Sequence, residues 1–234
     1  MTFTFHDYQI AAIQAGLASI GSKRNDLIVI PTAGGKTQIL AGIIERLLPS
    51  QQRILVVSHV REIIEQDERA IAQHLPGLDL GVYCAGLNRF EPGKQVVIGS
   101  VQSLYRRSYG RGFDVVLIDE AHRVGRLDTS MYQQLFAFLR RAGGGRERRL
   151  PILGLSATPY RLDSGYLHQG EDALFSRIAY DVPIPALLER KLLAPLVAPD
   201  SELSQIDFSA LPMRAGDYQI SAFEENTNWL TETA

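Results

Sequence analysis

Residues 27–37 read LIVIPTAGGKT, and this stretch predicts a β-strand, a glycine-rich loop and the start of a helix. The apolar run LIVI indicates the strand. Apolar residues that recur at spacings of one, three and four indicate the helix, which Pro49 ends after residue 48. The same alternation of strand and helix continues along the chain.

Five more apolar runs are candidate strands, and two more segments have helical period. The strands are predicted at residues 53–58, 80–85, 96–100, 113–119 and 151–157, and the helices at residues 61–75 and 131–142. Strands that are apolar on both faces and separated by helices indicate a parallel sheet covered on both sides. We therefore expect a three-layer α/β domain with a mainly parallel central sheet, whose ligands bind at the carboxyl ends of the strands.

Length and composition are those of a globular protein, with 234 residues and 45% hydrophobic residues, which excludes the disordered and fibrous classes. A formal net charge of −2 gives no bulk electrostatic argument for a nucleic-acid partner, so that case depends on local motifs. The single cysteine, Cys84, lies in an apolar run and is expected to be a buried thiol.

No secretory or membrane segment is recognisable. The first ten residues, MTFTFHDYQI, lack a charged region followed by an apolar one, and no apolar run reaches the roughly 18 residues of a membrane span. We expect a soluble, cytoplasmic protein with no membrane partner. Prolines become frequent after residue 182, so we expect residues 1–182 to form the domain and residues 183–234 to be an extension that leads out of it.

The loop in the opening stretch has the residue types of a phosphate-binding site. The Lys36 ammonium would reach the β- and γ-phosphates, the Thr37 hydroxyl would ligate Mg²⁺, and Gly35 would let backbone N–H groups approach the phosphates. The pattern G-x-x-x-x-G-K-[ST] asks for glycine where this chain has Ile30. A flexible turn before a helix is the alternative for this stretch alone.

A second element, VVLIDEAH at residues 115–122, predicts a buried strand that ends in two carboxylates. Asp119 would hold Mg²⁺ and Glu120 would take the proton from an attacking water. An acidic pair that caps a helix is the alternative. The lysine loop at the end of another strand favours the catalytic interpretation.

Together, PTAGGKT, DEAH and LSATP (residues 155–159) resemble motifs I, II and III of the superfamily 2 helicases, in the right order and at suitable spacing. The resemblance implies a RecA-like P-loop domain that binds ATP and Mg²⁺. Members of this superfamily often read P-T-G-A-G-K-T, so the order of Ala33 and Gly34 is a departure. The segment HDYQ (residues 6–9) resembles the one in which an aromatic residue and a glutamine recognise adenine, which implies that Tyr8 and Gln9 bind ATP together with Thr32, Ala33 and Gly34 of the loop. The resemblance also implies that His122, Ser156 and Thr158 couple the nucleotide site to the nucleic-acid side.

Two further segments resemble helicase motifs that contact the backbone of a nucleic-acid strand. They are VVSHVREIIEQ (residues 56–66) and GSVQSL (residues 99–104), with candidate contacts Ser58, His59, Arg61, Ser100 and Gln102. Such contacts give position and affinity but little sequence specificity. Arg106, Arg107 and Arg111 are possible extensions of this track, whereas the arginine-rich residues 140–149 fit a solvated loop equally well.

Nearly the whole chain resembles the RadD-like branch of bacterial DNA-repair helicases, through segments such as LGLSATPYRL and ALFSRIAYDVPIPALLERKLLAPL. The resemblance implies a DNA partner and a second RecA-like domain with an arginine finger, of which no Q-x-x-G-R-x-x-R-like segment occurs here. Since such an arginine contributes roughly 10³ to 10⁵ in rate, we expect this chain alone to bind ATP-Mg²⁺, hydrolyse it slowly and not unwind.

Four alternatives stay open from the sequence. They are the motor subunit of a restriction enzyme, an RNA helicase, a nucleic-acid-binding module with weak ATPase activity, and a small-molecule kinase. The kinase is disfavoured because DEAH and SAT have no role in it. The binding module is disfavoured because Lys36, Thr37, Asp119 and Glu120 are all present.

Overall fold

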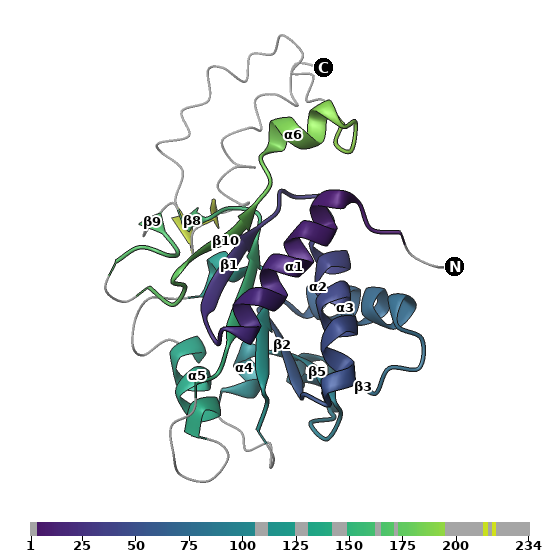
Figure 1. The fold of residues 1–234 in the computed structure, drawn as a ribbon. Helices are drawn as coiled ribbons and strands as arrows, with labels where there is room; N and C mark the ends of the chain where they lie inside the picture. The colour runs from purple at the N-terminus through teal and green to yellow at the C-terminus, as the bar shows by residue number, and fades with distance from the viewer. Residues whose placement is uncertain are drawn as a thin grey trace, which may run out of the picture.

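A computed structural model describes residues 4–105, 112–124, 131–141, 149–161, 165–170 and 173–194, together with the backbone of two short strands, β11 (Met213–Arg214) and β12 (Asp217–Tyr218). Figure 1 shows these elements as a central sheet with helices on both sides. The predicted fold class is confirmed.

The central sheet has eight strands in the order β10-β1-β7-β6-β2-β5-β3-β4, and every pair in it is parallel except β3 with β4. The strands are β1 (Asn25–Val29), β2 (Ile54–Ser58), β3 (Leu80–Cys84), β4 (Arg89–Phe90), β5 (Val96–Ser100), β6 (Val115–Ile118), β7 (Ile152–Ser156) and β10 (Arg177–Asp181). A separate hairpin joins β8 (Tyr160–Arg161) to β9 (Gly165–Tyr166).

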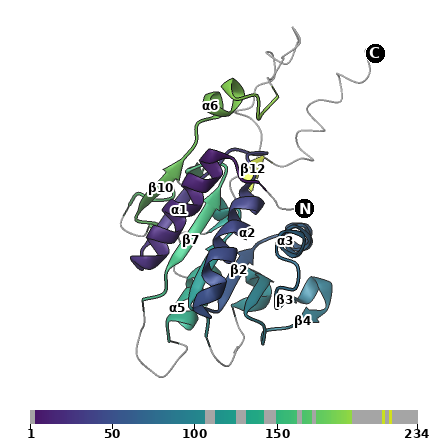
Figure 2. The ribbon, with the colours of Figure 1, turned by 45° about the vertical axis from the view of Figure 1, so that its right-hand side comes forward.

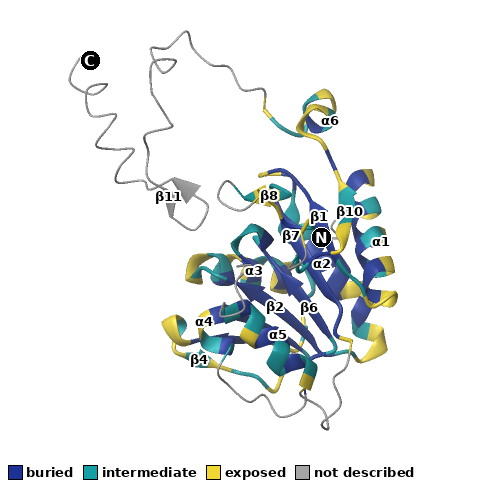
Figure 3. Ribbon diagram, turned by 90° about the vertical axis from the view of Figure 1, so that its left-hand side faces the viewer, coloured by how far each residue is buried: buried dark blue, intermediate teal, exposed yellow. Residues whose placement is uncertain are grey.

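Helices cover both faces of the sheet (Figures 1 and 2). One face carries α1 (Asp7–Gly21), α2 (Lys36–Leu47) and α3 (Arg61–His74), and the other carries α4 (Val101–Leu104) and α5 (Met131–Arg141). Successive strand residues point to opposite faces, so Ile28 packs in the first layer while Leu27 and Val29 pack in the second. Figure 3 shows the central strands as almost continuously buried, as expected for a parallel sheet covered on both sides.

Three-residue 3₁₀ turns connect several of these elements, at η1 (Leu48–Ser50), η2 (Ala85–Leu87) and η3 (Ala121–Arg123). The helix α6 (Ile184–Glu189) follows β10 and remains attached to the domain. Its Leu187 is fully buried, and Arg190 forms an ion pair with Asp7 at the start of α1. Among the described residues no helix is both long and apolar enough to cross a membrane.

The predicted strands and helices agree with the observed ones to within about two residues at each end. Strand β10 was not predicted. It pairs in parallel with β1 at the edge of the sheet, where its residues are only partly buried and its ends are charged, so its sequence lacks a strong apolar pattern. Asp26 of β1 fixes this edge, because its carboxylate lies 3.2 Å from the Nε atoms of both Arg24 and Arg177.

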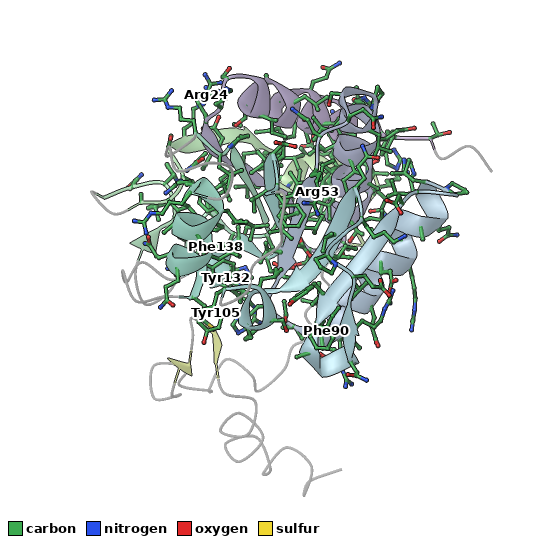
Figure 4. All side chains as sticks on the ribbon, turned by 90° about the horizontal axis from the view of Figure 1, so that it is seen from below. Arg24, Arg53, Phe90, Tyr105, Tyr132 and Phe138 are labelled. Carbon is green, nitrogen blue, oxygen red and sulfur yellow. The ribbon has the colours of Figure 1, made fainter. Side chains whose placement is uncertain are left out.

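Arg53, labelled in Figure 4, is a buried cation just before β2. Its guanidinium lies over the Phe113 ring at 4.5 Å from the centroid and donates to the carbonyl oxygens of Pro92, Lys94 and Gly112. This side chain therefore ties the approach to β6 to the loop before β5. On the α4 and α5 side, Figure 4 labels three aromatic residues, of which Tyr132 belongs to the buried core and Tyr105 and Phe138 pack against it.

Cys84 is a free thiol at the end of β3 and is 3% exposed, in agreement with the prediction of a buried core cysteine.

Candidate nucleotide site and nucleic-acid face

The sheet topology brings the three recognised motifs to one edge. The loop follows β1, the acidic pair follows β6, and Ser156 ends β7, which lies between those two strands in the sheet. All three strands are parallel, so their carboxyl ends meet at the same edge. Strand β2, the next in sequence after β1, lies beyond β6, so this edge is where the strand order changes direction and where such sheets bind ligands.

Residues 30–35 form the turn that leads into α2, and two of them adopt the left-handed backbone conformation. Gly35, the N-cap of α2, has φ 81°, and Ala33 has φ 63°. A β-carbon on Gly35 would lie 2.4 Å from Nε2 of Gln9, so that side chain would have to move, and the left-handed backbone favours glycine there. Beyond Gly35, the first backbone N–H groups of α2 lack helical partners, which is the arrangement that binds anions.

Tyr8 and Gln9 contact this loop from behind. The Tyr8 hydroxyl donates to the Gly34 carbonyl at 2.8 Å, and the Gln9 Oε1 accepts from the His6 N–H at 2.9 Å. Both side chains are buried, at 6% and 4% exposure. In this conformation the two side chains position the loop. The recognition of adenine by Tyr8 and Gln9 stays a prediction.

A cavity of about 410 Å³ opens in front of the loop, within the usual size range of ligand pockets. Lys36 points into it, with Nζ 3.4 Å from Oε1 of Glu120. Its lining residues come from the loop, α2, α3 and the end of β6: Thr32, Ala33, Gly35, Lys36, Thr37, Gln38, Ile63, Gln66, Asp67, Ala70, Asp119 and Glu120. Of the predicted ATP residues, Tyr8, Gln9 and Gly34 lie outside this lining.

The two carboxylates after β6 have different environments. Asp119 is 6% exposed, and burial together with the nearby Glu120 charge raises its pKa. Burial would also raise the pKa of Glu120, but the hydrogen bond with His122 and the positive charge of Lys36 outweigh it and hold that pKa below the ordinary value. Glu120 is therefore the more readily ionised of the pair. Its backbone is left-handed, with φ 50°, a strained state that is common at functional sites.

A chain of polar contacts leads from the cavity to the end of β7. His122 Nδ1 lies 3.3 Å from Oε2 of Glu120 and 3.3 Å from Oγ of Ser156. Ser156 Oγ in turn accepts from the Thr158 N–H at 3.3 Å. The residues that the sequence assigned to coupling are therefore in contact with one another and with Glu120.

The predicted nucleic-acid residues fall into two groups. His59, Arg61 and Gln102 lie at the surface, and Gln102 Nε2 donates to the His59 carbonyl at 3.2 Å. Ser58 is fully buried at the end of β2. Ser100 is 6% exposed and caps α4 by accepting from the Ser103 N–H. Both hydroxyls are therefore enclosed in this conformation, and the direct contact of Ser58 and Ser100 with a nucleic-acid strand stays a prediction.

Other basic candidates are only partly covered by the structure. Arg106, Arg107 and Arg111 lie outside the described residues, as do residues 142–148 of the arginine-rich segment. Arg140 and Arg149, at the two ends of that segment, line a separate cavity with Lys23 and Arg24.

The sequence did not predict that α3 forms one wall of the nucleotide cavity. Ile64, Asp67 and Ile71 are the buried residues of this helix, at spacings of three and four. The sequence signal was therefore available: a carboxylate stands on the apolar stripe of an amphipathic helix. Asp67 lies in the cavity next to Thr37, whose Oγ1 is 3.4 Å from Asp67 Oδ1.

A parallel α/β sheet that gathers a lysine loop, an Asp-Glu pair and a hydroxyl-bearing strand end at one edge is the arrangement of a helicase or translocase motor domain. Residues 2–161 match the family described as "Type III restriction enzyme, res subunit", and the chain belongs to that family.

Comparison with individual proteins agrees with this assignment. The chain is 30% identical over 159 residues to the DNA 3'-5' translocase XPB2 of Sulfurisphaera tokodaii, an alignment that covers 67% of this chain and 31% of that protein. The chain thus spans about a third of the curated relative it matches.

Solved structures share the fold at low sequence identity. The nuclease-deletion mutant of the Type ISP restriction-modification enzyme LlaGI, in complex with a DNA substrate mimic, has a TM-score of 0.60 at 14% identity, over 81% of this chain and 21% of that one. The UvsW helicase of bacteriophage T4 has a TM-score of 0.57 at 18% identity, over 75% and 59%. The SWI2/SNF2 ATPase core of Sulfolobus solfataricus, in complex with double-stranded DNA, has a TM-score of 0.56 at 15% identity, over 75% and 35%.

Proposed function

We propose that this chain is the ATP-binding half of a motor that moves along or separates DNA strands, with ATP-Mg²⁺ held between the loop at residues 30–37 and the carboxylates of Asp119 and Glu120. The observation that carries the proposal is one cavity lined by Lys36, Thr37, Asp119 and Glu120 at the carboxyl edge of the sheet. Contacts from Glu120 through His122 to Ser156 connect that cavity with the end of β7.

The residues of this cavity fit a nucleotide with its magnesium ion. A left-handed Gly35 leaves room for phosphate oxygens at the N-terminus of α2, and the Lys36 ammonium lies 3.4 Å from a carboxylate that it would leave for a phosphate. Within the described part of the chain, no group of three or more His, Cys, Asp or Glu side chains could hold a metal by itself. Magnesium suits such a site, because it is commonly bound by one or two carboxylates together with phosphates and waters.

We assign roles to these residues on that basis. Thr37 and Asp119 would hold Mg²⁺, which when bound neutralises charge on the phosphate oxygens. Lys36 orients the terminal phosphates. Glu120, ionised because of Lys36 and His122, accepts the proton of the attacking water. His122, Ser156 and Thr158 transmit the state of Glu120 to the end of β7.

The nucleic-acid strand would cross the surface formed by His59, Arg61 and Gln102, which lies beside the ends of β2 and β5. DNA is proposed as the substrate because the sequence relative is a DNA translocase and two of the structural relatives are DNA complexes. Contacts of this kind would follow the backbone with little sequence preference.

For the whole protein we propose a second RecA-like domain that supplies an arginine finger, a place in the RadD-like DNA-repair branch and a cytoplasmic location. The branch rests on the resemblance of residues 85–89, 96–104, 153–162 and 173–196. We also propose the boundary at residue 182. The extension begins with α6, which packs on the domain through Leu187.

Two substitutions test the nucleotide site. Lys36→Ala should abolish the binding of a fluorescent ATP analogue by this chain. In the complete protein, Glu120→Gln should preserve binding and lower the hydrolysis rate by about 10² to 10⁴, the range of general base catalysis. An unchanged hydrolysis rate would exclude Glu120 as the base.

Coupling between the two ligands tests the motor function. The analogue is titrated with and without single-stranded DNA, using wild type and His122→Ala. A motor domain should show a DNA-dependent change in nucleotide affinity that His122→Ala reduces. Independent binding of the two ligands by the wild type would favour a plain binding module.

The restriction-enzyme motor subunit is a second candidate, favoured by the family match and by the Type ISP structures. The two candidates share this domain and differ in the rest of the protein. ATP-dependent DNA cleavage by the complete protein, alone or with a methyltransferase partner, would establish the restriction function, and strand separation without cleavage would establish the helicase.

A further inference from the structure

Asp67 is the most deeply buried carboxylate of the nucleotide cavity and has no role in the motifs described above. It lies on the inner face of α3, between Ile64 and Ile71, and is 1% exposed. Its position is within the cavity lining, opposite the start of α2. An acidic side chain in such a place is costly unless a partner stabilises its charge.

One of its oxygens has a partner and the other has none. Oδ1 accepts a long hydrogen bond from the Thr37 hydroxyl, at 3.4 Å. Oδ2 is buried and makes no hydrogen bond within the described part of the chain. Asp119 and Glu120 line the same cavity, so Asp67 is a third carboxylate facing this space. Because buried carboxylates are usually paired with a cation or coordinate a metal, we look for the missing partner of Oδ2 in a bound cation.

Resting on the function proposed above, we propose that Asp67 is a positioning residue for the magnesium ion that accompanies the nucleotide. Its Oδ1 accepts the hydrogen bond of the Thr37 hydroxyl, so that the lone pairs of the Thr37 oxygen would be free for the metal. Its Oδ2 accepts a hydrogen bond from a water of the metal's hydration shell. Partners of this kind fix the orientation of metal ligands, and their loss usually costs about 10- to 100-fold in metal affinity.

Replacement of Asp67 should affect nucleotide affinity differently with and without Mg²⁺. In the absence of Mg²⁺, Asp67 gives the phosphates no favourable contact, so its removal should leave nucleotide affinity unchanged or raise it. In the presence of Mg²⁺, its removal weakens the metal site and lowers nucleotide affinity. A merely structural role would lower both affinities together.

The experiment compares wild type with Asp67→Asn, a substitution of nearly equal shape. The dissociation constant of a fluorescent, non-hydrolysable ATP analogue is measured in excess Mg²⁺ and in EDTA. Glu62→Gln is the matched control, because it removes the same charge from the same helix at a side chain that is 68% exposed. The ratio of the two constants, EDTA over Mg²⁺, should fall about 10- to 100-fold in Asp67→Asn and stay unchanged in Glu62→Gln.

Thermal unfolding in EDTA shows whether the variant is folded, and we expect Asp67→Asn to melt at or above the wild-type temperature. Should Asn fail to fold, Asp67→Ser serves as the second variant. On a Thr37→Ala background, Asp67→Asn should lose most of its effect, because the two residues act on the metal as a unit. An unchanged EDTA-to-Mg²⁺ ratio, or an equal loss of affinity in both conditions, would overturn the proposal for Asp67 while leaving the nucleotide site in place. A wild type that binds no analogue in either condition would overturn the proposed function itself.

Discussion

Ala33 has a left-handed backbone conformation, which glycine adopts more easily. We therefore expect that replacing Ala33 with glycine raises the free energy of unfolding. Its φ of 63° costs an L-residue roughly 1–2 kcal/mol relative to glycine. Glycine has a more flexible unfolded chain, which offsets roughly 0.5–1 kcal/mol of that gain. Ala33→Gly should therefore stabilise the protein by about 1 kcal/mol, or about 2–4 °C in Tm for a chain of this size.

At the neighbouring residue, Gly34, we expect a substitution to lower stability. A β-carbon on Gly34 would lie 2.7 Å from Cγ2 of Ile30 and 2.9 Å from the Pro31 carbonyl oxygen. Gly34→Ala should destabilise by about 1–3 kcal/mol, the usual range for overpacking. The double variant, which restores the order G-A-G-K-T without changing composition, should be close to or below wild type in stability because the loss at residue 34 offsets the gain at residue 33.

Thermal unfolding followed by circular dichroism, without nucleotide, measures these differences. Gln51→Gly is the matched control, since Gln51 has φ 56° in an exposed turn far from the cavity and should gain a similar amount. A rise in Tm for Gln51→Gly with no rise for Ala33→Gly would show that Ala33 is not left-handed and would refute the reasoning.

Four further substitutions test packing and the proposed nucleic-acid surface. Arg53→Met should lower the free energy of unfolding by about 2–4 kcal/mol in urea, because several backbone carbonyls lose their donor at once. Tyr8→Phe keeps the ring but removes the donor to the Gly34 carbonyl, so it should cost about 1 kcal/mol by the same measurement. Ser58→Ala should be neutral or slightly stabilising, because the buried hydroxyl makes no hydrogen bond among the described residues, and it should leave DNA affinity unchanged in a fluorescence anisotropy titration. Gln102→Ala, at the exposed surface, should weaken DNA binding in that titration, and the reverse pattern would restore Ser58 as a direct contact.

The sequence predicted the central strands and the nucleotide edge because both depend on strong local patterns. Buried parallel strands are apolar on both faces, and the loop and acidic pair have fixed residue types at the strand ends. Strand β10 escaped prediction since an edge strand that is only partly buried needs no apolar pattern.

The sequence also did not show which way individual side chains point. Ser58 and His59 are adjacent in sequence, yet one is buried at the end of a strand and the other lies at the surface. The motif assigned Tyr8 and Gln9 to the ligand, but it did not show that both side chains are buried or that Tyr8 donates to the Gly34 carbonyl of the loop. The sequence showed that Asp67 is a charged residue on the apolar face of a helix. Its place in the nucleotide cavity could not be predicted, because it depends on α3 lying opposite α2.

The burial of Cys84 makes the protein suited to site-specific labelling. Thiol reagents act on exposed thiolates, and the only cysteine of the chain lies inside the domain with 3% of its surface accessible. A cysteine introduced at the exposed Ile184 of α6 would be the one reactive site, with no need to remove a native residue first. A fluorophore attached there would report on α6, whose Leu187 lies close to Gly34 of the loop, while nucleotide or DNA is added.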